Sequence, residues 1–203
     1  GARNRSCRRL QRRGEFWPRG SRRFSGRAQV HLDDPRAHPQ TLYLWLSMQQ
    51  LATQIIGLAQ QQGWRICAAE SVTGGRIAAA LTAVSGASEV FFAGGVFYDV
   101  RAKMRFLGLT DEFFNELGVY STECAVEMAS RWRERCEADF CIATTGEAEP
   151  ADSPHGRVFF GVATPEQTTH TDTGFTGNRE QIQAAATEHA LRYLLKVMQE
   201  KLR

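Results

Sequence analysis

The sequence predicts an α/β fold in three layers, with helices on both faces of a mostly parallel sheet. Two observations predict it. Segments in which apolar residues recur with the period of a helix alternate along the chain with short apolar runs of strand length. The chain also has 203 residues, of which 42% are apolar, and this is enough for one domain with a sizeable core.

The first half of this pattern alternates helix and strand. A helix is expected over Met48–Gln62, because apolar residues recur there at helical spacing and Gly63 then ends the pattern. A strand over Arg65–Glu70 and a helix over Thr73–Val84 follow. The run Val90–Tyr98 contains mainly apolar residues and glycine, which is typical of a buried strand.

The middle of the chain is expected to be helical. Two short helices are predicted over Ala102–Leu107 and Asp111–Leu117. A longer helix begins at Ser121, whose hydroxyl is well suited to accept the first free N–H groups of a helix. The residues of this helix that should face the core are Cys124, Val126, Met128 and Ala129.

The last third of the chain completes the alternation. Strands are predicted over Asp139–Thr144, Arg157–Ala163 and Thr168–Phe175, and the last two should pair through a turn around Pro165. A long helix over Asn178–Leu202 follows, with apolar residues at helical spacing.

The segment Ala68–Gly75 (AAESVTGG) is the most informative part of the chain. It places Ser71 on a turn between a strand and a helix. The N–H groups of Thr73, Gly74 and Gly75 are expected to be the unpaired donors of the first helical turn, which can bind an anion or an oxyanion. The competing interpretation is that Ser71 or Thr73 caps the helix and that the glycines allow close packing.

Other polar residues follow the other predicted strands. Loops beyond the carboxyl ends of parallel strands gather at one edge of a sheet. We therefore expect one cluster made of Ser71, Tyr98, Thr144, Thr145 and Gly146.

A resemblance to a known family rests on five motifs in order, namely AESVTGG, GGVFYDVRAK, ATTGEAEP, HGRVFFGVAT and FTGNRE. This order resembles the C-terminal domain of the CinA family, the fold of the nicotinamide mononucleotide (NMN) deamidases, from about Met48 to Leu202. The resemblance implies an α/β/α sandwich with a mixed five-stranded sheet. It also implies an amidohydrolase that converts the carboxamide of NMN to nicotinate mononucleotide and ammonia.

The same resemblance implies roles for individual residues. Ser71 would be the nucleophile, assisted by Tyr98 and Lys103, and a buried lysine whose pKa is lowered can serve as the base. Residues that would hold the substrate are Thr73, Gly74, Gly75, Thr145, Gly146 and Arg179. Without the resemblance, Lys103 is also compatible with a solvated helix lysine, Tyr98 with sheet packing and Arg179 with a surface charge.

Several positions differ from the family pattern. Val72 stands where cysteine is usual, Glu147 and Glu149 stand where isoleucine and glycine are usual, and Asn178 replaces an aspartate. The two acids would repel an anionic nucleotide. Three functions therefore stay open: the amidohydrolase, a catalytically weak paralogue that acts as a binding or assembly module, and a nucleic-acid protein that binds through its N-terminal arm.

Charge is spread unevenly along the chain. Residues 1–47 contain 11 Arg and 3 acidic residues and carry a net charge of +8, whereas residues 48–203 carry −5. The predicted domain over 48–203 thus has no basic footprint for nucleic acid. We expect the arm to be disordered or weakly ordered. It is compatible with sequence upstream of a start at Met48, with a transit peptide, and with an arm that binds anionic surfaces.

The remaining expectations concern cofactors and location. No cluster of His, Cys, Asp and Glu has metal-ligand spacing, so neither a metal nor another cofactor is expected. Five cysteines form no CxxC pair, and Cys67 and Cys141 fall in predicted buried strands, which favours a reducing, cytoplasmic location. The apolar run Leu42–Leu46 is too short to span a membrane. The expected partner is a small pyridine nucleotide, and a homo-oligomer remains an option.

Overall fold

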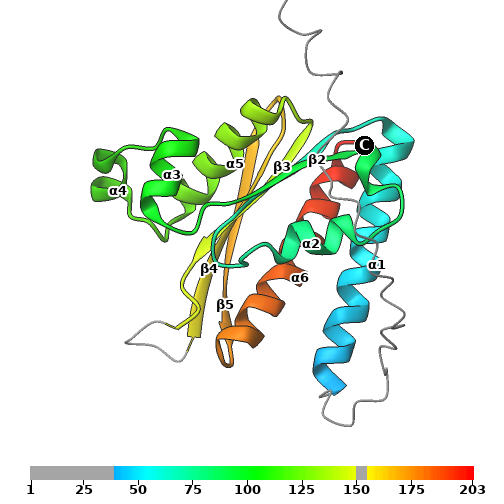
Figure 1. Cartoon of the computed structure of the whole chain (residues 1–203), viewed down its shortest axis with the longest axis horizontal. Helices are drawn as coiled ribbons and strands as arrows, with labels where there is room; N and C mark the ends of the chain where they lie inside the picture. The colour runs from blue at the N-terminus through cyan, green and yellow to red at the C-terminus, as the bar shows by residue number, and fades with distance from the viewer. Residues whose placement is uncertain (1–38, 150–154) are drawn as a thin grey trace, which may run out of the picture. The chain divides into compact units, whose positions relative to one another are not determined.

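The computed structural model describes residues 39–149 and 155–203. They form a five-stranded sheet with the strand order β2-β1-β3-β4-β5, and helices cover both of its faces (Figure 1). The strands are β1 (Ile66–Glu70), β2 (Phe91–Val96), β3 (Phe140–Gly146), β4 (His155–Ala163) and β5 (Thr168–Thr176). The predicted α/β fold with a mixed five-stranded sheet is therefore confirmed.

The sheet has a parallel part and an antiparallel part. Strand β1 pairs in parallel with β2 and with β3, whereas β4 runs antiparallel to both β3 and β5. Four of the five strands consequently point in the same direction. The predicted pairing of the last two strands is confirmed, since β4 and β5 pair from His155 opposite Thr176 to Ala163 opposite Thr168.

The described residues also form six α-helices and one short 3₁₀ helix. They are α1 (Pro39–Gln62), α2 (Arg76–Thr82), η1 (Ala87–Glu89), α3 (Val100–Leu107), α4 (Asp111–Leu117), α5 (Thr122–Cys136) and α6 (Arg179–Glu200). Helices α1, α2 and α6 lie on one face of the sheet, and α3, α4 and α5 lie on the other (Figure 1). Among these helices none is long and apolar enough to cross a membrane.

The two central strands are buried on both faces. Every residue of β1 and of β3 is buried, and their sequences, ICAAE and FCIATTG, are correspondingly almost free of charge. Ile66 and Ala68 face the core under α1 and α6, while Cys67 faces the core under α5. Cys67 and its neighbour across the strands, Cys141, are fully buried free thiols, as the sequence predicted.

Side chains cap the helices where the sequence placed their beginnings. Ser121 Oγ accepts a hydrogen bond from the N–H of Cys124 at the beginning of α5. Asn178 and Gln181 form a reciprocal capping box at the beginning of α6. Within α5, the sequence predicted that Val126 would face the core, but Val126 is only partly buried. Its neighbour Ala125 is buried instead.

The first helix is longer than predicted. Helix α1 begins at Pro39 and not at Met48, so residues 39–47, which the sequence placed in the arm, are helical. The hydroxyl of Ser47 donates a hydrogen bond of 2.9 Å to Glu188 of α6. The rest of the predicted arm, residues 1–38, lies outside the described residues.

The prediction that the second strand is buried was wrong. Strand β2 lies at the edge of the sheet and alternates between half-buried and exposed residues. A bulge opposite Ile66 and Cys67 leaves Phe92 outside the regular pairing, and Phe92 is largely exposed. The alternation was hidden in the sequence because the bulged Phe92 directly follows Phe91 and because Gly94 and Gly95 carry no side chains.

Candidate active site

The expected gathering of strand ends is present. The carboxyl ends of the parallel strands β2, β1 and β3 lie at one edge of the sheet. The chain leaves β1 towards α2 on one face and leaves β2 towards α3 on the opposite face (Figure 1). Loops that diverge in this way open a crevice at the edge of an α/β sheet.

A serine and a lysine meet at this edge. Ser71 directly follows β1, and its Oγ lies 3.0 Å from Nζ of Lys103 on α3. Both residues are buried, with exposed fractions of 4% and 0%. The two groups are within hydrogen-bond distance without a bridging group, and a nucleophile with its base requires this spacing.

The position of Lys103 follows from the way α3 begins. Asp99 caps the helix by accepting a hydrogen bond of 2.8 Å from the N–H of Arg101. Lys103 and Leu107, four residues apart, then lie on the buried face of the helix. Burial lowers the pKa of the Lys103 amine from its ordinary value, while Cys124 and Asp99 act in the opposite direction. The amine is therefore more readily neutral than that of an exposed lysine.

The turn after β1 differs from the expected anion site. Helix α2 begins at Arg76 and not at Thr73, with Gly75 as its N-cap. The carboxylate of Glu70 accepts hydrogen bonds from the N–H groups of Gly75, Ile77 and Ala78, at 2.9, 3.1 and 2.8 Å. The protein's own carboxylate thus occupies the anion position.

The predicted substrate-binding residues of this turn are likewise engaged. The N–H of Gly74 donates to the carbonyl of Ser71 at 3.0 Å. The hydroxyl of Thr73 is buried and bonded to Glu70 and to Thr144, each at 2.8 Å. The prediction that Thr73, Gly74 and Gly75 offer free donors is wrong for both glycines, and the side chain of Thr73 stabilises the turn.

A small cavity opens above Ser71. Its volume is about 170 Å³. The residues that line it are Ser71, Val72, Tyr98, Tyr120, Gly146, Glu147, Ala148, Glu149 and Arg179. Lys103 lies next to the cavity through its contact with Ser71. Of the predicted site residues, the cavity brings together Ser71, Tyr98, Gly146 and Arg179.

Arg179 connects three segments around this cavity. It lies at the beginning of α6 and donates hydrogen bonds to the hydroxyl of Tyr98 at 2.6 Å and to Glu149 at 3.0 Å. Tyr98 belongs to the loop after β2, and Glu149 belongs to the loop after β3. Tyr98 therefore contacts Arg179, whereas Ser71 and Lys103 meet directly.

Of the three residues predicted at the end of β3, namely Thr144, Thr145 and Gly146, only Gly146 lines the cavity. Gly146 has a φ of +152°, and a Cβ at this position would lie 2.4 Å from the carbonyl oxygen of Arg157, so the close approach of β4 requires glycine. The hydroxyl of Thr145 is buried and donates to the carbonyl of Val119 at 3.0 Å. Thr145 thus holds the loop before α5 and does not line the cavity.

Sequence reasoning missed three residues of this region. Glu70 anchors the turn, Gln183 on α6 donates to the carbonyl of Val72 at 2.9 Å, and Tyr120 lines the cavity. A carboxylate at the end of a buried strand is unusual enough to have indicated a role for Glu70. Gln183 and Tyr120 reach the site only through tertiary contacts, which no local pattern indicates.

Comparison with known proteins decides the family. The model of the CinA C-terminal domain matches residues 48–198 of this chain. The chain belongs to the CinA family. Two curated relatives are CinA-like proteins, from Acidobacterium capsulatum (34% identical, over 83% of this chain and 40% of the relative) and Geotalea daltonii (38% identical, over 70% and 35%). The chain thus spans about two fifths of the length of the first and about a third of the second.

Solved structures agree with this membership. A CinA superfamily protein from Klebsiella pneumoniae is 29% identical and superposes with a TM-score of 0.72, covering 75% of this chain and 98% of that one. A competence/damage inducible protein from Agrobacterium tumefaciens is 33% identical, with a TM-score of 0.69 over 74% and 94% of the two chains. The fold of this CinA chain is therefore that of its relatives.

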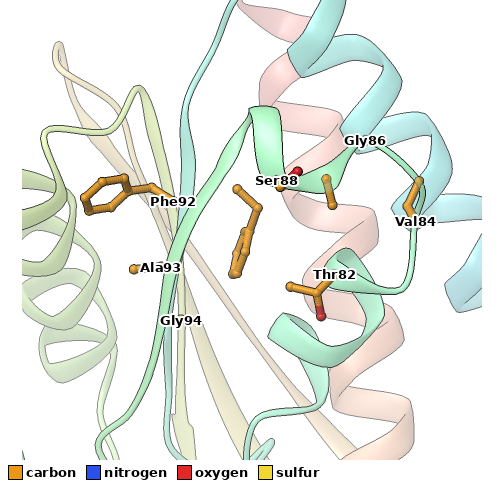
Figure 2. Close-up of a pocket in the computed structure, with 9 residues that line it drawn as sticks. Thr82, Val84, Gly86, Ser88, Phe92, Ala93 and Gly94 are labelled. Atoms are coloured by element: carbon orange, nitrogen blue, oxygen red, sulfur yellow. The ribbon is translucent and has the colours of Figure 1, made fainter. Parts of the chain in front are cut away.

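A larger hollow of this CinA domain lies away from Ser71. It has a volume of about 500 Å³ and lies between the edge strand β2 and the segment that joins α2 to η1 (Figure 2). Its lining residues are Thr82, Val84, Gly86, Ala87, Ser88, Phe91, Phe92, Ala93 and Gly94. None of these side chains titrates near neutral pH, so the larger hollow lacks the groups that acid–base chemistry needs.

Metal-binding groups are absent from the described part of this CinA domain. In residues 39–149 and 155–203, no group of three or more His, Cys, Asp and Glu side chains could hold a metal ion.

Proposed function

We propose that this CinA domain is a cytoplasmic amidohydrolase that cleaves the carboxamide of NMN, or of a related pyridine amide, to the acid and ammonia. The observation that carries this proposal is the 3.0 Å contact between Lys103 Nζ and Ser71 Oγ beside a cavity at the carboxyl edge of the sheet. The four described cysteines are free thiols, which supports a reducing compartment.

In the first half of the reaction Ser71 is acylated. Lys103, as a neutral amine, takes the proton of the Ser71 hydroxyl while Oγ attacks the carboxamide carbon. The tetrahedral intermediate collapses when its nitrogen receives a proton from the Lys103 ammonium and leaves as ammonia. The product of this half is an ester between the acyl group and Ser71.

In the second half water releases the acid. A water molecule loses a proton to Lys103 and attacks the ester carbon, after which Ser71 regains its proton and the carboxylic acid departs. The lowered pKa of Lys103 supports both halves, because only the neutral amine accepts a proton.

The developing oxyanion needs hydrogen-bond donors. Val72, which directly follows the proposed nucleophile, lines the cavity, and no described residue accepts a hydrogen bond from its N–H. In serine hydrolases with a strand-to-helix turn the same position supplies an oxyanion donor. We assign this role to Val72, while the aromatic ring of Tyr98 and the guanidinium of Arg179 form the walls against which the substrate lies.

Ammonia release from NMN by the full chain tests the proposal. Ser71→Ala should reduce kcat/KM by about 10³-fold or more, because it removes the nucleophile. Ser88→Ala, a matched change in the larger hollow, should leave the rate unchanged. The proposal fails if Ser71→Ala releases ammonia as fast as the unaltered protein, or if neither NMN nor any other pyridine carboxamide is hydrolysed.

A second function is favoured by the ion pair of Arg179. Because Glu149 already pairs with this guanidinium, the structure is also compatible with a domain that binds or assembles with a partner and has little catalytic activity. Such a module would bind a pyridine nucleotide equally well with serine or alanine at position 71 and release no ammonia.

A further inference from the structure

We infer that the cavity above Ser71 selects an aromatic carboxamide that carries a positive charge and no phosphate. The phosphate-free riboside of NMN, an N-substituted pyridinium carboxamide, is the simplest example. This inference rests on the proposed function of Ser71 and specifies the substrate class of that site.

The first support is the charge of the cavity wall. Two acidic residues, Glu147 and Glu149, line the cavity, and Arg179 is the only basic residue among its described lining residues. Lys103 is buried below, and its amine contacts Ser71. With Lys103 neutral, as its role as a base requires, the wall carries one net negative charge, which attracts a cation and repels an anion.

The second support is the state of Arg179. A phosphate would ordinarily bind such an arginine through two parallel hydrogen bonds. Here one guanidinium nitrogen donates to Glu149 at 3.0 Å and the other terminal nitrogen donates to Tyr98 at 2.6 Å. A phosphate that bound both terminal nitrogens would compete with Glu149 and would then lie close to its carboxylate. The guanidinium is thus already paired with one of the protein's own acids.

The third support is the aromatic and steric character of the cavity. Tyr98 and Tyr120 both line it, and their exposed fractions of 55% and 52% show that their rings are accessible. Tyrosine rings attract cations through their π faces. The volume of about 170 Å³ is below the about 300–1,000 Å³ of most ligand pockets, so it suits one ring with its carboxamide and leaves the rest of a nucleotide at the acidic rim.

The substrate preference can be measured directly with the full chain. Ammonia release is followed with the riboside, with NMN and with neutral nicotinamide. The expected kcat/KM for the riboside exceeds that for NMN by about ten-fold or more. The difference should shrink as salt is added, because the two acids are exposed and their charges are screened. A value for NMN that equals or exceeds that of the riboside overturns the inference.

A charge-removing variant assigns the preference to the two acids. Glu147→Gln combined with Glu149→Gln keeps the size of both side chains and frees Arg179. It should raise kcat/KM for NMN by about ten-fold and lower that for the riboside. The control Glu116→Gln makes the same chemical change at an exposed position of α4, away from the cavity. It should alter kcat/KM for neither NMN nor the riboside. The inference is overturned if the double variant has the same ratio of kcat/KM for the riboside and for NMN as the unaltered protein.

Binding separates this inference from the proposed function. If none of the three amides yields ammonia, the proposed function fails, and the affinity of Ser71→Ala for the riboside and for NMN still tests the selectivity. Tighter binding of the riboside by about ten-fold supports the inference. Equal binding, tighter binding of NMN, or no binding of either compound overturns it.

Discussion

Two loops border the same cavity and are held in opposite ways. The turn after β1 is fixed from inside, by the buried carboxylate of Glu70 and by Gln183, which donates to the carbonyl of Val72. The loop after β3 is held at its outer part by the ion pair of Glu149 with Arg179, whose side chains are 61% and 45% exposed. Breaking a buried hydrogen bond lowers the stability of the fold markedly, whereas an exposed ion pair contributes little to the free energy of unfolding. The serine that we propose as nucleophile thus lies on the rigid loop, and the charges that we propose to face a substrate lie on the adaptable one.

Lys103→Met is the change with the largest expected effect. It removes the proposed base and keeps the apolar stem, so kcat/KM should fall by about 10³-fold or more while the melting temperature is maintained or rises. The unaltered protein should lose activity as the pH falls through the lowered pKa of Lys103, which lies below the ordinary value of about 10.4. The residual activity of the variant should lack this pH dependence.

The control for this change is Lys196→Met, because Lys196 is an exposed lysine on α6. It should leave the pH–rate profile unaltered. A profile of Lys103→Met that keeps the acid limb would show that another group is the base.

Glu70→Ala tests the rigid loop. It leaves the hydroxyl of Thr73 and the N–H groups of Gly75, Ile77 and Ala78 without their acceptor. The free energy of unfolding should fall by about 3 kcal/mol, and the melting temperature by about 10 °C. Calorimetry of this variant beside Glu116→Ala, an exposed acid on α4, measures the difference. A loss no larger than that of the control would mean that water replaces the carboxylate.

Glu149→Gln should have the smallest effect on stability. Its ion pair with Arg179 is exposed, so the free energy of unfolding should change by less than about 0.5 kcal/mol. The melting temperature should remain within about 2 °C of that of the unaltered protein. A drop comparable to that of Glu70→Ala would remove the contrast between the two loops.

The sequence predicted the parts of this molecule that depend on local pattern. The strand around Cys67, the capped beginning of α5 at Ser121 and the long helix that begins after Asn178 each follow from residues that are close in the sequence. The family motifs further predicted that Ser71 and Lys103 would be neighbours, and they lie 3.0 Å apart.

What the sequence could not predict depends on contacts between distant segments. The bulge at Phe92 arises from the register of β2 against β1. The N–H groups of Gly74 and Gly75 are a local exception: they donate to Ser71 and to Glu70, which lie close in the sequence, but the acceptor of each N–H depends on how the turn folds. Likewise, only the approach of α6 to the loop after β3 shows that Arg179 is held by Glu149.

The burial of Lys103 also makes it a chemical reporter. The chain has three lysines, and the other two, Lys196 and Lys201, lie exposed at the carboxyl-terminal end of the molecule. An amine-acylating reagent reaches those two side chains in the native protein, but it reaches the fully buried Lys103 only when α3 separates from the turn that carries Ser71. The rate at which Lys103 is acylated therefore measures how often this edge of the sheet opens.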